Sequence, residues 1–302
     1  MRSDTRWPTF LILGAPRSGT TFLFRALAGH KEVYASPVKE PLYFYAPAGQ
    51  AWPRPEMTTA EYQRLFDGAA PGQARGEAST LYLSDPQAAD RIARTLPDAR
   101  LIAILRDPVE RAFSHYTLHR MVHREPLKTF ADAIAAEESR SLQADQPAFL
   151  YLRLGLYGEQ IRRYLERFPR EQLLFIRYQD LNRDPARVIG QTFEFLGLEP
   201  EIGGAPPARV NAAQTYRVPG LAALLESSAG KWLRARTPER LRDAVQTRMQ
   251  TPRPRVDPKM RSALVEYFRD DIRLTERLLG WDLESWLDVQ LVSDERVPAA
   301  GN

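Results

Sequence analysis

Residues 10–27 read FLILGAPRSGTTFLFRAL and constrain the fold of this chain more than any other stretch. The short apolar run 10–13 suits a strand that is buried on both faces, and the glycine and proline residues after it favour a turn. From Thr20 onward the apolar residues recur at the spacing of one helix face. The sequence therefore predicts a strand, a glycine-bearing loop and a helix, as in an α/β fold.

The loop between this strand and helix has the residue types of a phosphate-binding site. Backbone N–H groups and the positive end of a helix dipole meet at such a junction, and both stabilise an anion. Two glycines with four residues between them match the first half of the nucleotide P-loop pattern. However, Thr20 stands where ATP and GTP enzymes place a lysine, and the cation is Arg17 instead. We therefore expect hydroxyls, backbone and arginine to hold a phosphate without a required metal ion.

A second strand-to-helix junction has residues that suit the same ligand. Residues 101–105 form a continuous apolar run, and Asp107 and Pro108 have the types favoured at a helix N-cap and first helical position. Ligands of open α/β sheets bind at the carboxyl ends of the strands. Arg106 directly follows this run, and an arginine suits a phosphate because its guanidinium donates two hydrogen bonds.

These segments resemble the sulfotransferases that use 3′-phosphoadenylyl sulfate (PAPS), particularly the branch of heparan sulfate enzymes and many bacterial relatives. The similar segments are, in order, GAPRSGTTFL, KEPLYF, GEAST, LRDPVERAFSHY, GLYGEQIRRYLERFP, YQDLNRDP and RVDPKMRSALVEYF. The resemblance covers residues 8–282 and is weakest over 199–251. It implies a P-loop kinase-like, three-layer α/β fold with a mainly parallel sheet flanked by helices. It also implies transfer of a sulfuryl group from PAPS to a hydroxyl or amine, with release of 3′,5′-ADP.

The resemblance assigns roles to individual residues. Glu40 would be the base that takes the proton from the acceptor, since an alcohol is a poor nucleophile until its proton is removed. Arg17 would stabilise the charge on the leaving oxygen. Arg106 and Ser114 would bind the 3′-phosphate. The rest of the cofactor-binding set is Ser18, Gly19, Thr20 and Thr21 in the first loop, and Arg253 and Arg255 in a basic loop over the nucleotide.

Both carboxylates near these motifs have alternative explanations. Glu40 could form a surface ion pair with Lys39, and a structural role is favoured over a chemical one for Glu77. The related heparan enzymes carry a lysine where this chain has Ala78. That departure, together with the aromatic residues 43–45, favours a small-molecule or lipid-like acceptor over a polysaccharide. The aromatic residues could equally pack the loop.

Three histidines recur at helical spacing after the second junction. His115, His119 and His123 recur every four residues, but no nearby carboxylate pattern accompanies them. We therefore expect a surface or substrate-side position for the stripe and no metal site. Tyr157 and Arg153 lie where the family approaches substrate or cofactor, and packing explains them equally well.

Composition bounds the remaining possibilities. The 302 residues suffice for one sulfotransferase domain, 1–302, with a tail at 288–302 that we expect to be flexible; the alternative is a separate helical unit after Gly203. The net charge of +4, from 42 basic and 38 acidic residues, is too small to indicate a nucleic-acid partner. With no cysteine and no long apolar run, we expect a cytoplasmic protein without a membrane span. The sequence does not set the oligomeric state.

Two other functions are compatible with a phosphate-binding loop. A magnesium-dependent kinase for a small molecule suits the fold, but it is opposed by Thr20 in the place of lysine. A nucleotide-binding module without catalysis would leave Glu40 as a surface acid. The paired motifs, GAPRSGTTFL and LRDPVERAFSHY, favour the sulfotransferase.

Overall fold

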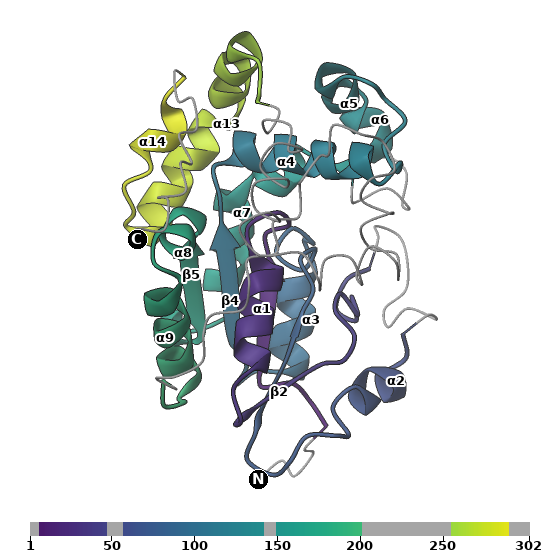
Figure 1. Cartoon of the computed structure of the whole chain (residues 1–302), viewed down its shortest axis with the longest axis vertical. Coiled ribbons are helices and arrows are strands. Elements are labelled where there is room, and N and C mark those ends of the chain that lie inside the picture. The colour runs from purple at the N-terminus through teal and green to yellow at the C-terminus, as the bar shows by residue number, and fades with distance from the viewer. Residues whose placement is uncertain (1–5, 47–56, 142–148, 201–254, 290–302) are drawn as a thin grey trace, which may run out of the picture.

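A five-stranded parallel sheet with helices around it forms the centre of the protein in the computed structural model, which describes residues 6–46, 57–141, 149–200 and 255–289 (Figure 1). All four strand pairings are parallel, and the strand order is β2-β3-β1-β4-β5. This architecture agrees with the predicted parallel α/β fold. The strands are β1 (Phe10–Gly14), β2 (Val33–Ala35), β3 (Ala74–Ala78), β4 (Arg100–Leu105) and β5 (Leu173–Arg177).

Helices connect consecutive strands and cover the sheet (Figure 1). Two 3₁₀ turns, Arg153–Gly155 and Arg170–Gln172, accompany them. The helices are α1 (Thr20–Ala28), α2 (Thr59–Arg64), α3 (Ala88–Thr95), α4 (Pro108–Met121), α5 (Phe130–Ala135), α6 (Glu137–Ser141), α7 (Tyr157–Leu165), α8 (Tyr178–Arg183), α9 (Pro185–Leu196), α13 (Pro258–Leu279) and α14 (Glu284–Leu287).

Strand β1 lies between β3 and β4 and supplies side chains to two separate apolar clusters. Leu11 and Leu13 belong to a cluster that reaches α3, α7 and α13. Phe10 and Ile12 belong to a second cluster that reaches α1 and α9. Successive side chains of a strand point to opposite faces, so the two clusters lie on the two faces of the sheet. The expected strand, buried on both faces, is confirmed.

Three of the described helices, α4, α9 and α13, each begin at an Asp-Pro pair, which fixes where the helix starts. Asp107, Asp184 and Asp257 each precede a proline and accept hydrogen bonds from backbone N–H groups of the first turn. Aspartate satisfies N–H groups that lack an intrahelical partner, and proline suits a position that needs no N–H. The predicted cap at 107 is therefore confirmed, and Asp257 caps α13 in the same way.

Two segments differ from what their sequence patterns suggest. The spacing of the apolar residues over 152–168 predicts one helix, but this prediction is wrong at its start, because Leu156 leaves the helical region (ψ 78°) and α7 begins only at Tyr157. Leu154 and Tyr157, on either side of this break, are both buried, so packing overrides local helix preference. The amphipathic residues 130–138 are divided between α5 and α6. Residues 221–233 and 238–249, for which the sequence also predicts helices, lie outside the described residues, as does the part of the predicted tail, 288–302, that begins at residue 290.

No helix in the described part of the chain combines the length and apolar character needed to cross a membrane.

Glycine at position 76 is required by the pairing of β1 with β3. Phe10 pairs with Gly76, and a Cβ at Gly76 would lie 2.0–2.3 Å from atoms of the Phe10 ring.

We expect Gly76→Ala to lower the free energy of unfolding by at least about 2 kcal/mol, measured by urea denaturation. Gly190→Ala is the control. No atom lies within 4 Å of its added methyl group, so this helical substitution should raise the free energy by about 0.5–1 kcal/mol. Equal stabilities of the two variants would contradict this account of the sheet.

Candidate active site

The loop between β1 and α1 has the backbone of an anion-binding turn. Gly19 precedes α1 in a left-handed conformation (φ 90°), and no side chain caps the helix. The Ser18 side chain is fully buried, and its hydroxyl has no hydrogen-bond partner in the part of the chain that the structure describes. Thr20 is also buried, and Thr21 is half-buried. The start of α1 therefore offers N–H groups and a buried hydroxyl to a ligand.

Backbone strain coincides with the two residues expected to be catalytic. Among the described residues, four other than glycine have a positive φ, and these include Arg17 (68°) and Glu40 (58°). Such conformations cost free energy and cluster at functional sites, where the surrounding structure holds them. Leu42 (56°) lies in the same segment as Glu40, whereas His123 (57°) follows α4.

Three residues expected to bind the donor lie together where the loop meets the second junction. The Arg17 Nε donates a hydrogen bond to the Ser114 Oγ at 3.2 Å. The Arg106 Nη1 donates to the backbone carbonyl of Arg17 at 3.4 Å. The guanidinium of Arg106 also lies over the ring of Tyr178, 4.8 Å from its centroid. Two cationic side chains, a hydroxyl and a helix N-terminus are thus concentrated at one edge of the sheet.

Glu40 is held at the same edge by the segment after β3. Its Oε2 accepts a hydrogen bond from the Thr80 backbone N–H at 2.7 Å, and the Thr80 hydroxyl lies 3.2 Å from both carboxylate oxygens. Its Oε1 contacts the Lys39 Nζ at 2.6 Å, which is the ion pair considered as an alternative. The Glu40 side chain is 34% exposed. The carboxylate is therefore anchored on one side and open to solvent on another.

A second carboxylate, Glu77, lies fully buried in β3. The hydroxyl of Tyr62 donates to its Oε1 at 3.2 Å. Desolvation raises the pKa of Glu77 to about 7, and the negative charge of Glu40 acts in the same direction. A buried carboxyl group of this kind carries a proton over much of the range in which an exposed glutamate is ionised.

Burial decides between the two explanations for the aromatic residues after Glu40. Tyr43, Phe44 and Tyr45 are all buried, and the ring of Tyr43 stacks on Tyr62 with centroids 4.2 Å apart. Packing, the second of the two explanations offered for these residues, therefore describes them. Arg255 is exposed, two residues before the cap of α13, and Arg253 lies outside the described residues.

The surface position, one of the two predicted for the histidine stripe, is wrong for two of its three members. His115 and His119 are buried, with ring centroids 4.5 Å apart, and only His123 is exposed. Desolvation lowers the pKa of both buried rings, that of His119 to about 4. Burial of His115 and His119 could have been predicted from their four-residue spacing, which places both on one helix face. Arg111, four residues earlier, lies on the same face and is also buried. Within the described ranges, no group of three or more His, Cys, Asp or Glu could hold a metal ion.

Two residues that contact the predicted site at this edge, Thr80 and Tyr178, were not predicted from the sequence. Thr80 contacts Glu40, and Tyr178 lies against the guanidinium of Arg106. Both come shortly after the end of a strand, β3 or β5. The available signal was that the carboxyl ends of all parallel strands meet at one edge.

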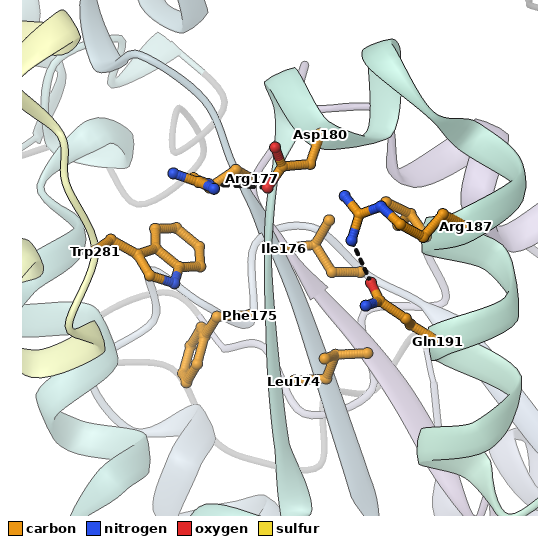
Figure 2. A pocket seen from close by; sticks show the side chains of 9 residues that line it. Leu174, Phe175, Ile176, Arg177, Asp180, Arg187, Gln191 and Trp281 are labelled. Carbon is orange, nitrogen blue, oxygen red and sulfur yellow. Dashed lines mark hydrogen bonds and ion pairs between the residues drawn. The ribbon is translucent and has the colours of Figure 1, made fainter.

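A separate cavity of about 120 Å³ lies along β5 (Figure 2). Its polar groups contact one another: Arg177 pairs with Asp180 at 2.8 Å, and Arg187 donates to Gln191 at 3.1 Å. The lining residues are Leu174, Phe175, Ile176, Arg177, Asp180, Arg187, Val188, Gln191 and Trp281, none of which belongs to the predicted site.

Comparison with known proteins agrees with this geometry. The sulfotransferase domain family matches residues 8–212. The chain belongs to the sulfotransferase family. The crystal structure of a sulfotransferase from Alicyclobacillus acidocaldarius superposes with a TM-score of 0.71 and 29% identity, covering 93% of this chain and 99% of the other. The predicted family and its P-loop kinase-like fold are thus confirmed.

Curated relatives of this sulfotransferase-family chain include heparan sulfate enzymes. The human bifunctional heparan sulfate N-deacetylase/N-sulfotransferase 3 is 30% identical over 95% of the chain, and the human heparan sulfate glucosamine 3-O-sulfotransferase 3B1 is 30% identical over 64% of it. The chain spans only 32% and 46% of the lengths of these two proteins.

The raised pKa of Glu77 predicts a pH dependence of stability. Between the ordinary glutamate pKa of 4.5 and the folded value of about 7, the folded protein binds a proton that the unfolded chain has lost. Stability therefore falls as pH rises through this window. Glu77→Gln cannot ionise, so we expect wild type to lose about 2 kcal/mol more than the variant between pH 5 and 8.

Urea denaturation of both proteins at the two pH values measures this difference. Asp271, whose pKa burial raises to about 6, is present in both proteins and cancels in the comparison. Identical losses of stability would show that Glu77 ionises normally in the folded protein.

Proposed function

We propose that this chain transfers a sulfuryl group from PAPS to a hydroxyl or amine of an acceptor and releases 3′,5′-ADP. The observation that carries the proposal is the hydrogen bond from Arg17 to Ser114, which joins the phosphate loop to the second junction. With Arg106 donating to the Arg17 carbonyl, donors from both motifs converge on one place. Membership of the sulfotransferase family supports the same reaction.

The two phosphates of the donor would occupy different parts of this edge. The 5′-phosphate, which carries the sulfuryl group, would lie at the uncapped start of α1 against Ser18, Gly19, Thr20 and Thr21. The 3′-phosphate would lie against Arg106 and Ser114 of the second junction. Arg255 and Arg253 would close over the nucleotide from the segment before α13.

Transfer would proceed in line, in a single displacement. The acceptor oxygen or nitrogen attacks sulfur as Glu40 takes its proton, and the bond from sulfur to the phosphate oxygen breaks. Arg17 donates to the phosphate oxygen on which negative charge grows. Arginine keeps its proton in proteins, so Arg17 acts as an electrostatic clamp and does not supply a proton. No step in this scheme needs a metal ion.

The acceptor that we propose is a small-molecule or lipid-like compound and not a polyanion. Ala78, where the resemblance places a lysine in the heparan enzymes, is fully buried in an apolar cluster, so this position supplies no cation for a polyanion. Val38 is 43% exposed and gives apolar surface two residues before Glu40. The buried aromatic residues 43–45 no longer support this choice. Assays with hydrophobic alcohols and with heparan sulfate, each with labelled PAPS, distinguish the two acceptor classes.

Calorimetric titration tests the donor site. We expect tight binding of 3′,5′-ADP in EDTA, unchanged by magnesium, and weak binding of ATP in both conditions. Arg106→Ala should weaken 3′,5′-ADP binding by about 10- to 100-fold, because it removes charged hydrogen bonds to a phosphate. Arg162→Ala, which removes an exposed arginine on α7, is the control and should bind normally. Magnesium-dependent binding of ATP without binding of 3′,5′-ADP would replace this proposal by a kinase.

Turnover of Glu40→Gln tests the proposed base. Glutamine keeps the size of the side chain but cannot accept the acceptor proton, so we expect turnover to fall by about 100-fold or more. The affinity for 3′,5′-ADP should stay unchanged. Glu266→Gln is a matched control, because Glu266 is also paired with one basic side chain but is 71% exposed on α13. Near-normal turnover of Glu40→Gln would remove Glu40 from the mechanism.

A further inference from the structure

Thr80 supplies both of its donors to Glu40. Its N–H donates to Oε2 at 2.7 Å, and its hydroxyl lies 3.2 Å from each carboxylate oxygen. Thr80 is 8% exposed, whereas Lys39, the other partner, is 28% exposed and contacts only Oε1. Thr80 is therefore the fixed partner of the carboxylate, and Lys39 is the exchangeable one.

The segment that carries Glu40 is laid along the segment that carries Thr80. The N–H of Glu40 donates to the Ala78 carbonyl at 2.9 Å. The N–H of Leu42 donates to the Ser79 hydroxyl at 3.0 Å, and that of Phe44 to the Tyr82 hydroxyl at 3.2 Å. These bonds hold two positive-φ residues, at 40 and 42, in backbone conformations that cost free energy.

The same segment is also fixed to the strand before the phosphate loop. The N–H of Ser79 donates to the Ile12 carbonyl at 3.1 Å, and that of Leu83 to the Leu13 carbonyl at 2.9 Å. A Cβ at Gly14 would lie 2.9 Å from the Thr80 carbonyl oxygen, so the two backbones are in close contact. Residues 78–83 therefore hold the phosphate loop on one side and Glu40 on the other.

We propose that Thr80 is a positioning residue that holds the Glu40 carboxylate in register with the donor while the acceptor displaces Lys39. This inference rests on the proposed role of Glu40 as base. Oε1, which Lys39 covers, is the oxygen left for the acceptor proton, since the Thr80 N–H occupies Oε2. The pair is partly exposed, at 28% for Lys39 and 34% for Glu40, so water can replace Lys39 more readily than it can replace Thr80, which keeps the carboxylate oriented after Lys39 has moved.

Two substitutions at one position separate the hydroxyl from the shape of the side chain. Thr80→Val keeps the shape and the backbone N–H but loses the hydroxyl, and Thr80→Ser keeps the hydroxyl. We expect kcat to fall about tenfold in Thr80→Val and to stay within about twofold of wild type in Thr80→Ser. The affinity for 3′,5′-ADP, measured by calorimetry, should not change in either variant.

The double variant Thr80→Val, Glu40→Gln distinguishes positioning of the carboxylate by Thr80 from a general structural effect of the substitution. If Thr80 acts through the carboxylate, Thr80→Val should lower kcat little further once Glu40→Gln is present. A structural role would lower turnover by the same factor in both backgrounds. That result would overturn the inference, as would full turnover of Thr80→Val or equal losses in Thr80→Val and Thr80→Ser.

Failure of the inference can be told from failure of the proposed function. Low turnover of Glu40→Gln together with normal turnover of Thr80→Val would retain Glu40 as base and reject Thr80 as its positioning residue. High turnover of Glu40→Gln would reject the base itself, and the inference about Thr80 would fall with it.

Discussion

The pairing of β1 with β3 on one side and β4 on the other is the constraint on which the rest of the structure depends. Parallel strands end at the same edge, so this pairing brings three sequence-distant loops together. The loop after β1 carries Arg17, the segment after β3 carries Thr80, and the junction after β4 carries Arg106. The hydrogen bonds from Ala15 to Ile104 and from Ser79 to Ile12 extend the sheet contacts into these loops.

Charge at this edge is arranged to receive an anion on one side and to keep a carboxylate accessible on the other. Arg106 donates a hydrogen bond to the Arg17 carbonyl, while the Arg17 side chain donates to Ser114. Glu40 has its own donors in Thr80 and Lys39. Because Arg17, Arg106 and Glu40 each have a partner within the chain, their arrangement is held by the protein itself.

The sequence predicted those features that depend on short segments. The apolar run 10–13 and the aspartate cap at 107 depend on neighbouring residues, and the structure agrees with both. The two phosphate motifs meet across 97 positions of the chain, at Arg17 and Ser114, and their pairing was expected only from the family resemblance. Other features that depend on distant contacts were missed or wrong. Thr80 meets Glu40 across 40 positions of the chain, and the burial of His115 and His119 requires Tyr151 from a later segment. Helix preference around Leu156 was likewise overridden by packing.

The buried polar face of α4 explains why Ser114 can serve the site. Arg111 and His115 lie on that face, where Arg111 contacts the Tyr151 carbonyl and the His115 ring. Such contacts fix the rotation of the helix about its axis, because burying these groups without partners would be costly. The buried ion pair of Asp107 with Arg261, at 2.9 Å, fixes the start of the same helix against α13. With rotation and origin both set, Ser114 is held toward Arg17, and this polar network thereby fixes the geometry of the proposed donor site.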